Sequence, residues 1–105
     1  MGLAEAQASE AGRDVRTATF QMRELGKAQA MSELPGMFKI VSDGATGKVL
    51  GVHIAGAHAT DLIAEAGLAL RLGASVRDIA ATIHAHPTLA EGLYEAALSL
   101  VEAGG

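Results

Sequence analysis

The stretch FKIVSDGATGKVLGVHIA, from Phe38 to Ala55, decides the fold of this chain. Two apolar runs, residues 38–42 and 48–55, flank five turn-forming residues at 43–47. β-Branched and aromatic side chains favour strands, and a short glycine-containing segment between two such runs is typical of a hairpin. The sequence therefore predicts an antiparallel β-hairpin over residues 38–55.

Upstream of the hairpin, the sequence predicts a helix and one more strand. Residues 3–11 are strong helix formers, and Gly12 stands where such a helix would end. Alternating β-branched residues predict a half-exposed strand over residues 15–22. We expect the mixed segment 23–36 to be a loop with one helical turn around 27–31.

Downstream of the hairpin, the pattern changes to helices. Apolar residues recur at helical spacing before Gly73, and Ser75-x-x-Asp78 is a loose capping box. Three helices are expected, at residues 60–72, 75–83 and 87–102. Because these helices are segregated from the strands, the sequence predicts an α+β fold, an antiparallel sheet with helices packed on one face.

Length and charge narrow the class of protein. The chain has 105 residues, which is one ordinary domain, and a formal net charge of -4. That charge argues against a nucleic-acid binder, which normally carries a basic patch. The chain has no apolar run of about 18 residues to span a membrane and no signal-peptide pattern at its start. We expect a cytoplasmic protein that binds neither nucleic acid nor membrane.

Scarce residue types are also informative. The chain has no cysteine, so it has no disulfide, thiolate metal site or redox dithiol of its own. It contains 13 glycines but only two Phe, one Tyr and no Trp. Aromatic side chains bury the largest apolar areas, so the core gains less stabilisation per residue than one rich in them. We therefore expect the domain to pair with a partner surface.

The stretch that carries chemistry is IHAHPTLAE, residues 83–91. The residue before a proline is held out of the α region, so His86 is expected in an extended segment just ahead of a helix. Glu91 can reach back to one imidazole nitrogen, fixing the tautomer and stabilising the imidazolium as in base catalysis. The alternative is structural, because Thr88-x-x-Glu91 is also a capping box with Thr88 as N-cap. Spacing alone leaves both interpretations open.

The four histidines raise the question of a metal site. His84-x-His86 could present two imidazoles on one side of an extended segment, but structural zinc sites usually show four closely patterned ligands. We expect no metal site. We interpret His53 as a strand residue facing water or a partner, and His58 as a residue near a helix start. The chain also lacks the Gly-x-Gly-x-x-Gly turn of a dinucleotide site.

These motifs together resemble the dimerisation domain of the flavin-dependent pyridine nucleotide–disulfide oxidoreductases, in particular those of the dihydrolipoamide dehydrogenase type. The similarity extends over essentially the whole chain, and its most specific part is the block His84-Ala85-His86-Pro87-Thr88-x-x-Glu91. The other matching motifs are Asp43-x-x-Thr46-Gly47-x-Val49-Leu50-Gly51-Val52-His53-Ile54, Ala64-Glu65-Ala66, and Met1-Gly2-Leu3-Ala4-Glu5, which is similar to Val-Gly-Leu-Thr-Glu in the family.

The resemblance implies an active site shared between two subunits. Such enzymes associate as homodimers through this domain, and its His-Pro loop enters the partner's site beside the FAD and the redox disulfide. By analogy, His86 would be the acid/base that deprotonates the substrate dithiol, and Glu91 would orient and charge-stabilise it. The backbone at His84, Ala85 and Pro87 would pass close to the partner's flavin. Electrons would pass from dihydrolipoamide, on the lipoyl-bearing subunits of 2-oxo acid dehydrogenase complexes, through the disulfide and FAD to NAD.

The sequence departs from the family pattern at two places. The FAD and NAD domains, the redox cysteines and the first strand of this domain would all precede Met1. We therefore expect residues 1–105 to form a single dimerisation domain that binds no cofactor, is inactive alone and has an unpaired sheet edge. Ala4 replaces the usual Thr, which removes an N-cap worth about 1 kcal/mol. The alternative is a stand-alone dimerisation or protein-interaction module without catalytic activity.

Overall fold

The computed structural model describes residues 1–12, 14–31, 35–56 and 58–104. Each helix and strand predicted from the sequence is present, and the α+β class is confirmed. Of the loop predicted over residues 23–36, residues 32–34 lie outside the described part of the chain, and the expected helical turn is present at Gly26–Met31. In chain order the elements are α1 (Glu5–Glu10), β1 (Val15–Gln21), the 3₁₀ turn η1 (Met22–Glu24), α2 (Gly26–Met31), β2 (Gly36–Asp43), β3 (Val49–Gly56), α3 (Ala59–Leu72), α4 (Val76–Ala81) and α5 (Glu91–Gly104). None of the helices in these ranges combines the length and the apolar character that crossing a membrane requires.

The sheet has three antiparallel strands in the order β1-β2-β3. β2 and β3 form the predicted hairpin, in which Phe38 lies opposite Ile54. Asp43 stabilises the turn, because its Oδ1 accepts hydrogen bonds from the backbone N–H groups of Ala45 (2.8 Å) and Thr46 (3.2 Å). β1 pairs with the other edge of β2, so β2 is the central strand.

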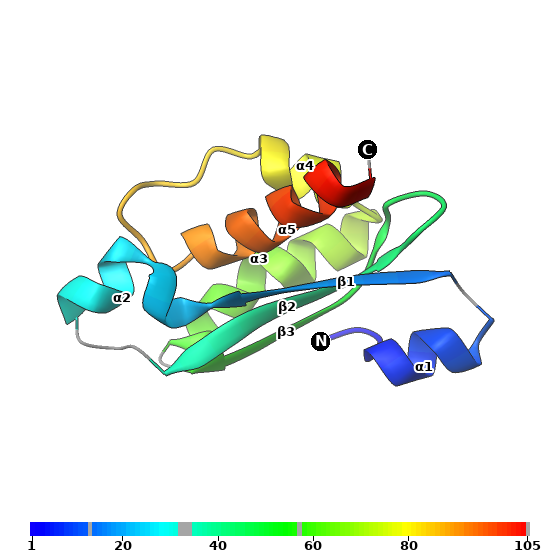
Figure 1. The fold of residues 1–105 in the computed structure, drawn as a ribbon, viewed down its shortest axis with the longest axis horizontal. Coiled ribbons are helices and arrows are strands. Elements are labelled where there is room, and N and C mark those ends of the chain that lie inside the picture. Colours follow the sequence, from blue (N-terminus) through cyan, green and yellow to red (C-terminus); the bar gives the residue numbers. More distant parts are fainter. Residues whose placement is uncertain (13, 32–34, 57, 105) are drawn as a thin grey trace.

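Helices α3 and α5 lie side by side over one face of the sheet (Figure 1), and the main core lies between the two layers. Side chains alternate across a strand, so every second residue of β2 faces these helices. Phe38 and Ile40 are fully buried there, in one cluster with Leu93 and Ala97 of α5. Gly92 allows this close packing, because a methyl group on it would overlap the ring of Phe38. The start of α5 is thereby held against the centre of the sheet.

The opposite face of the sheet is covered by α1 at one end (Figure 1). Ala8 of α1 is fully buried there in a small second cluster with Val41 and Leu50. Ala4 provides no hydroxyl to cap α1, although its own backbone N–H donates to the side-chain oxygen of Gln7 (2.9 Å). The helix therefore keeps one of the two hydrogen bonds of a capping box.

The first three residues of the chain lie along the outer edge of β3. The Val52 N–H donates to the carbonyl oxygen of Met1 (2.8 Å), and the Leu3 N–H donates to that of Leu50 (2.9 Å). Along this stretch the edge of β3 is paired, whereas the sequence led us to expect an open sheet edge.

Local signals in the sequence set the end of α3 and the start of α4. α3 ends at Gly73, whose φ of 67° is accompanied by a hydrogen bond from the Ala74 N–H to the carbonyl of Ala69 (2.9 Å). α4 begins with the predicted capping box. The Ser75 N–H donates to Oδ2 of Asp78 (2.9 Å), and the Asp78 N–H donates to Oγ of Ser75 (3.3 Å).

The far end of α4 differs from the prediction. The helix ends at Ala81 and not at residue 83, because Thr82 has extended backbone angles. The hydroxyl of Thr82 donates to the carbonyl of Asp78 (2.7 Å), one of the last carbonyls of the helix. α4 is therefore two residues shorter at this end than its composition suggests.

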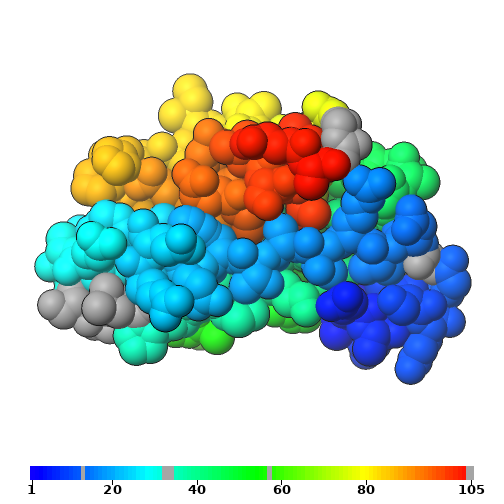
Figure 2. Space-filling view, in the orientation of Figure 1, coloured from blue at the N-terminus to red at the C-terminus, as the bar shows by residue number. Residues whose placement is uncertain are grey.

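The start of α5 also differs from the prediction. The helix begins at Glu91 and not at residue 87. The hydroxyl of Thr88 donates to the carbonyl of Ala85 (2.7 Å) and does not cap the helix. Residues 82–90, here called the connecting segment, are therefore irregular, and they form the upper left margin of the molecule in Figures 1 and 2.

Candidate functional site

The connecting segment and the first residue of α5 carry the predicted site. His86 is exposed over 76% of its side chain, and the His86–Pro87 peptide bond is cis. Glu91 is the first residue of α5, and its side chain is 19% exposed. Nδ1 of His86 lies 3.0 Å from Oε1 and 2.9 Å from Oε2 of Glu91. The contact predicted from the five-residue spacing is therefore present.

Glu91 also binds the backbone of the connecting segment. Its Oε1 accepts a hydrogen bond from the N–H of Thr88 (2.8 Å). This bond, followed by the contact with His86, lowers the pKa of Glu91 below its ordinary value of 4.5. The carboxylate is ionised at neutral pH and only accepts hydrogen bonds, so Nδ1 of His86 is the N–H donor. Nε2 is then the nitrogen able to accept a proton.

Glu91 makes one contact that belongs to each of the two interpretations that the sequence left open. The bond to the Thr88 N–H is the glutamate half of a capping box. The threonine half is missing, because the Thr88 hydroxyl donates to the carbonyl of Ala85. One carboxylate therefore holds the entry to α5 and orients the imidazole of His86.

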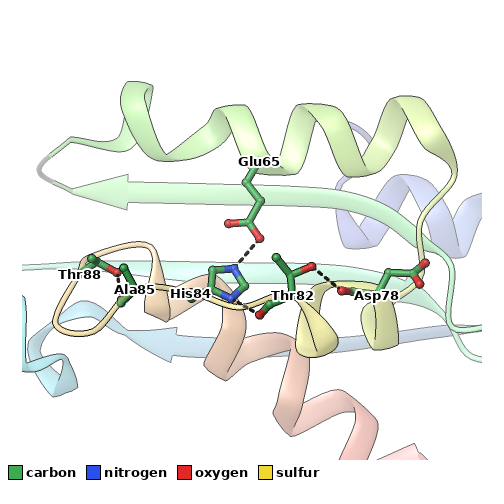
Figure 3. A network of polar contacts seen from close by, with 6 residues as sticks. All are labelled: Glu65, Asp78, Thr82, His84, Ala85 and Thr88. Atoms are coloured by element: carbon green, nitrogen blue, oxygen red, sulfur yellow. Dashed lines mark hydrogen bonds and ion pairs between the residues drawn. The ribbon is translucent and has the colours of Figure 1, made fainter.

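His84 differs from His86 in both exposure and partners. Only 6% of its side chain is exposed. Its Nδ1 lies 2.9 Å from the carbonyl oxygen of Thr82, and its Nε2 lies 2.6 Å from Oε2 of Glu65 (Figure 3). The ring centroids of His84 and Tyr94 are 5.6 Å apart. The ring of His84 is therefore packed within the domain, between α3 and α5.

Sequence analysis assigned no role to Glu65, although it lies in one of the matching motifs. Asp61 and Arg71 suit the first and last turns of α3, where charges interact favourably with the helix dipole. Glu65 is the remaining charged residue of this helix and lies in its middle. That position was the available signal, but its partner His84 is 19 residues away and cannot be identified from spacing.

The remaining histidines do not join this cluster. His53, on β3, places Nε2 3.1 Å from the carbonyl oxygen of Leu3. His58 precedes α3, and its Nδ1 lies 3.6 Å from Oδ2 of Asp61. In the part of the chain that the structure describes, no three histidine or carboxylate side chains come together as metal ligands. The two histidines of the connecting segment bind separate glutamates.

A nucleotide cofactor bound by this chain would need a parallel sheet with a glycine-rich turn between a strand and a helix. All strand pairs among the described residues are antiparallel, and β3 leads into α3 without a Gly-x-Gly-x-x-Gly turn. These residues therefore do not fit FAD or NAD as a cofactor held by this chain. The connecting segment instead offers an exposed surface at Ala85, His86 and Pro87, with an ionised carboxylate beside the imidazole.

The sequence matches a known domain over most of its length. Residues 1–97 match the family model described as "Pyridine nucleotide-disulphide oxidoreductase, dimerisation domain". The chain is 46% identical over 100 residues to a dihydrolipoyl dehydrogenase of Thermus scotoductus, covering 95% of this chain and 22% of that protein. It is also 46% identical over 99 residues to a dihydrolipoyl dehydrogenase of Bacillus subtilis, covering 94% of this chain and 21% of that protein. The chain thus spans about a fifth of the length of these relatives.

Solved structures agree with this match. LpdA from Mycobacterium tuberculosis superposes with a TM-score of 0.88 at 25% sequence identity, over 95% of this chain and 22% of that chain. The flavoprotein disulfide reductase RclA from Escherichia coli, in its Cu(II) complex, has a TM-score of 0.87 at 23% identity and shows the same fold, over 93% of this chain and 22% of that chain. The family match, the identities and the antiparallel three-stranded fold point the same way, and the chain belongs to the family of pyridine nucleotide-disulphide oxidoreductase dimerisation domains.

Proposed function

We propose that this domain serves a dihydrolipoyl dehydrogenase-type enzyme and supplies His86 and Glu91 as an acid/base pair to the active site of the partner subunit in a homodimer. The observation that carries the proposal is the contact between an exposed imidazole and an ionised carboxylate at 2.9 Å and 3.0 Å. An exposed pair on one domain can act on a substrate bound by another. The names of the relatives at 46% identity support dihydrolipoamide as the substrate.

The proton transfer follows from the geometry of the pair. Glu91 holds the Nδ1–H, so Nε2 of His86 takes the proton from a thiol of dihydrolipoamide. The resulting thiolate is the form that attacks a disulfide sulfur. The imidazolium that forms on His86 is stabilised by the negative charge of Glu91. The carboxylate therefore contributes orientation and charge, and the imidazole carries the proton.

FAD and NAD would be held by other parts of the enzyme, where the flavin supplies the two-electron redox chemistry. The exposed residues Ala85 and Pro87 are suited to lie beside the flavin of the partner subunit. The ring of His84 is not, because it is 94% buried and bonds to Thr82 and Glu65. Taken alone, the domain holds half of a site, so we expect it to be inactive.

The test uses a hybrid enzyme in which this chain replaces the matching segment of the Bacillus subtilis dihydrolipoyl dehydrogenase. We expect His86→Gln to lower turnover of dihydrolipoamide by about 10²- to 10⁴-fold, the usual contribution of a general base. Flavin absorbance should be unchanged. Glu91→Gln should have a smaller effect, because the amide oxygen can still accept the N–H of Thr88. His58→Gln, at an exposed histidine outside the site, is the matched control.

Unchanged turnover in the His86→Gln hybrid would refute the assignment of His86 as the base. That outcome would favour the second candidate, a dimerisation or interaction module without a catalytic role. Its supporting observation is that Leu68 and Leu72 of α3 are 59% and 72% exposed, as expected of residues that contact a partner.

A further inference from the structure

The buried imidazole of His84 is held from both sides. The carbonyl oxygen of Thr82 only accepts hydrogen bonds, so Nδ1 of His84 carries a hydrogen. Nε2 faces the carboxylate of Glu65 at 2.6 Å, so the two groups are in close hydrogen-bond contact. The side chain of Glu65 is 29% exposed and that of His84 is 6% exposed, so little water competes for this contact. The hydrogen bond to Glu65 therefore holds the ring of His84 against α3.

This attachment joins the connecting segment to a helix that it does not follow in the chain. Figure 3 shows Glu65 reaching from α3 to the ring of His84, the hydrogen bond between His84 and Thr82, and two further hydrogen bonds within the segment and α4. Those two further bonds are local: Thr82 binds Asp78 of α4, and Thr88 binds Ala85. Among the described residues, the Glu65–His84 contact is the one side-chain hydrogen bond between the segment and α3.

The side chains that face His84 come from two helices, α3 and α5. Glu65 approaches from α3, and the ring of Tyr94 approaches from α5 at a centroid distance of 5.6 Å. Glu91, at the start of α5, is close enough for the charge of His84 to contribute to lowering its pKa. His84 thus lies between α3, which binds its ring, and α5, whose first residue binds His86.

We propose that Glu65 and His84 are positioning residues, which fix the connecting segment on α3 and thereby place His86 against Glu91 for proton transfer. The catalytic consequence rests on the proposed function, but the positioning itself does not. His86 is two residues beyond His84, and the Thr88 N–H that binds Glu91 is four residues beyond it. If His84 is released from Glu65, residues 84–88 lose their attachment to α3. These residues supply both hydrogen-bond partners of Glu91, the imidazole of His86 and the N–H of Thr88.

The test measures the pKa of Glu91 in the 105-residue chain by ¹³C NMR of its side-chain carboxyl group. That pKa is lowered first by the Thr88 N–H and next by His86, so it reports on the geometry of the segment. We expect Glu65→Ala to raise the pKa of Glu91 toward its ordinary value. Loss of a neighbouring negative charge would by itself lower that pKa, so a rise isolates movement of the segment.

Two further variants separate positioning from charge. Glu65→Gln removes the charge but keeps an amide group that can hydrogen-bond to Nε2 of His84, and it should leave the pKa of Glu91 lowered. Asp61→Ala, on the same helix at an 81% exposed side chain, is the matched control and should change nothing. An unchanged or lower pKa of Glu91 in Glu65→Ala would overturn the proposal. If Glu65→Ala does not fold, Glu65→Leu replaces it under the same criterion, because it keeps most of the side-chain volume and loses the hydrogen bond to His84.

The same substitutions in the hybrid enzyme test the catalytic consequence. Small displacements of a catalytic group cost up to about 10²-fold, so Glu65→Ala should lower kcat by about 10- to 100-fold and leave KM for NAD and flavin content unchanged. Glu65→Gln should restore most of kcat. Should His86→Gln leave turnover unaltered, the proposed function fails, and the NMR result on the isolated chain still decides the positioning. If Glu65→Ala keeps the wild-type kcat while His86→Gln is inactive, the positioning proposal is refuted and the proposed function stands.

Discussion

Replacement of Gly92 by alanine tests whether close packing of α5 on the sheet sets the position of the candidate site. Gly92 follows Glu91 at the start of α5, and a methyl group on it would overlap the ring of Phe38. That ring is fully buried in the main core. Cores are close-packed, so the overlap is relieved only if the ring or the start of α5 moves.

The magnitude follows from two opposing effects. Inserting a methyl group into a packed core costs about 1–3 kcal/mol. Alanine gains up to about 1 kcal/mol over glycine in a helix, and this offsets part of the cost. We therefore expect the free energy of unfolding to fall by about 1–2 kcal/mol, which for a domain of this size lowers Tm by about 4–16 °C.

The assay is urea and thermal unfolding of the chain, followed by circular dichroism. Gly26→Ala, at the start of α2, is the matched control, because nothing lies within 4 Å of the position its Cβ would take. It should leave stability unchanged or raise it slightly. A Gly92→Ala variant as stable as the wild type would refute the packing argument. A destabilised variant with an unchanged pKa of Glu91 would refute the link between packing and the site.

Two further substitutions test single contacts. The folded-state pKa of Glu91 is lowered, so its contacts stabilise the fold fully above pH 4.5 and are lost as pH falls through the lowered value. The free energy of unfolding of the wild type should therefore fall more steeply below pH 4.5 than that of Glu91→Gln, and parallel profiles in urea titrations at each pH would contradict this. Ala4→Thr should add about 1 kcal/mol to the free energy of unfolding, because Ala4 already has the extended backbone of an N-cap and Gln7 already accepts its N–H. Equal urea midpoints for Ala4→Thr and wild type would show that the hydroxyl does not reach the helix.

Elements whose signals are local were predicted correctly. The hairpin needs only two strand-forming runs and the turn residues between them, among which Asp43 binds the backbone of its own turn. Gly73 ends α3 and Ser75 starts α4 through hydrogen bonds that span a few residues. The start of α5 was predicted too early, because the hydroxyl of Thr88 had two possible partners and the structure uses the carbonyl of Ala85. Sequence pattern alone does not rank two such competing local bonds.

The contacts of the candidate site were likewise predictable where they are local and not where they join distant residues. His86 and Glu91 are five residues apart, so their contact was predictable from the chain, as was the α+β class from the segregation of strands and helices. The attachment of His84 to Glu65 depended on the tertiary structure, because it joins residues 19 apart on separate elements. The distance between His84 and Glu65 depends on how α3 and α5 pack on the sheet. That packing results from contacts throughout the core. The sequence thus determined that His86 and Glu91 can meet and which elements carry them, whereas only the packed fold brought His84 to Glu65, because that contact depends on how separate elements pack.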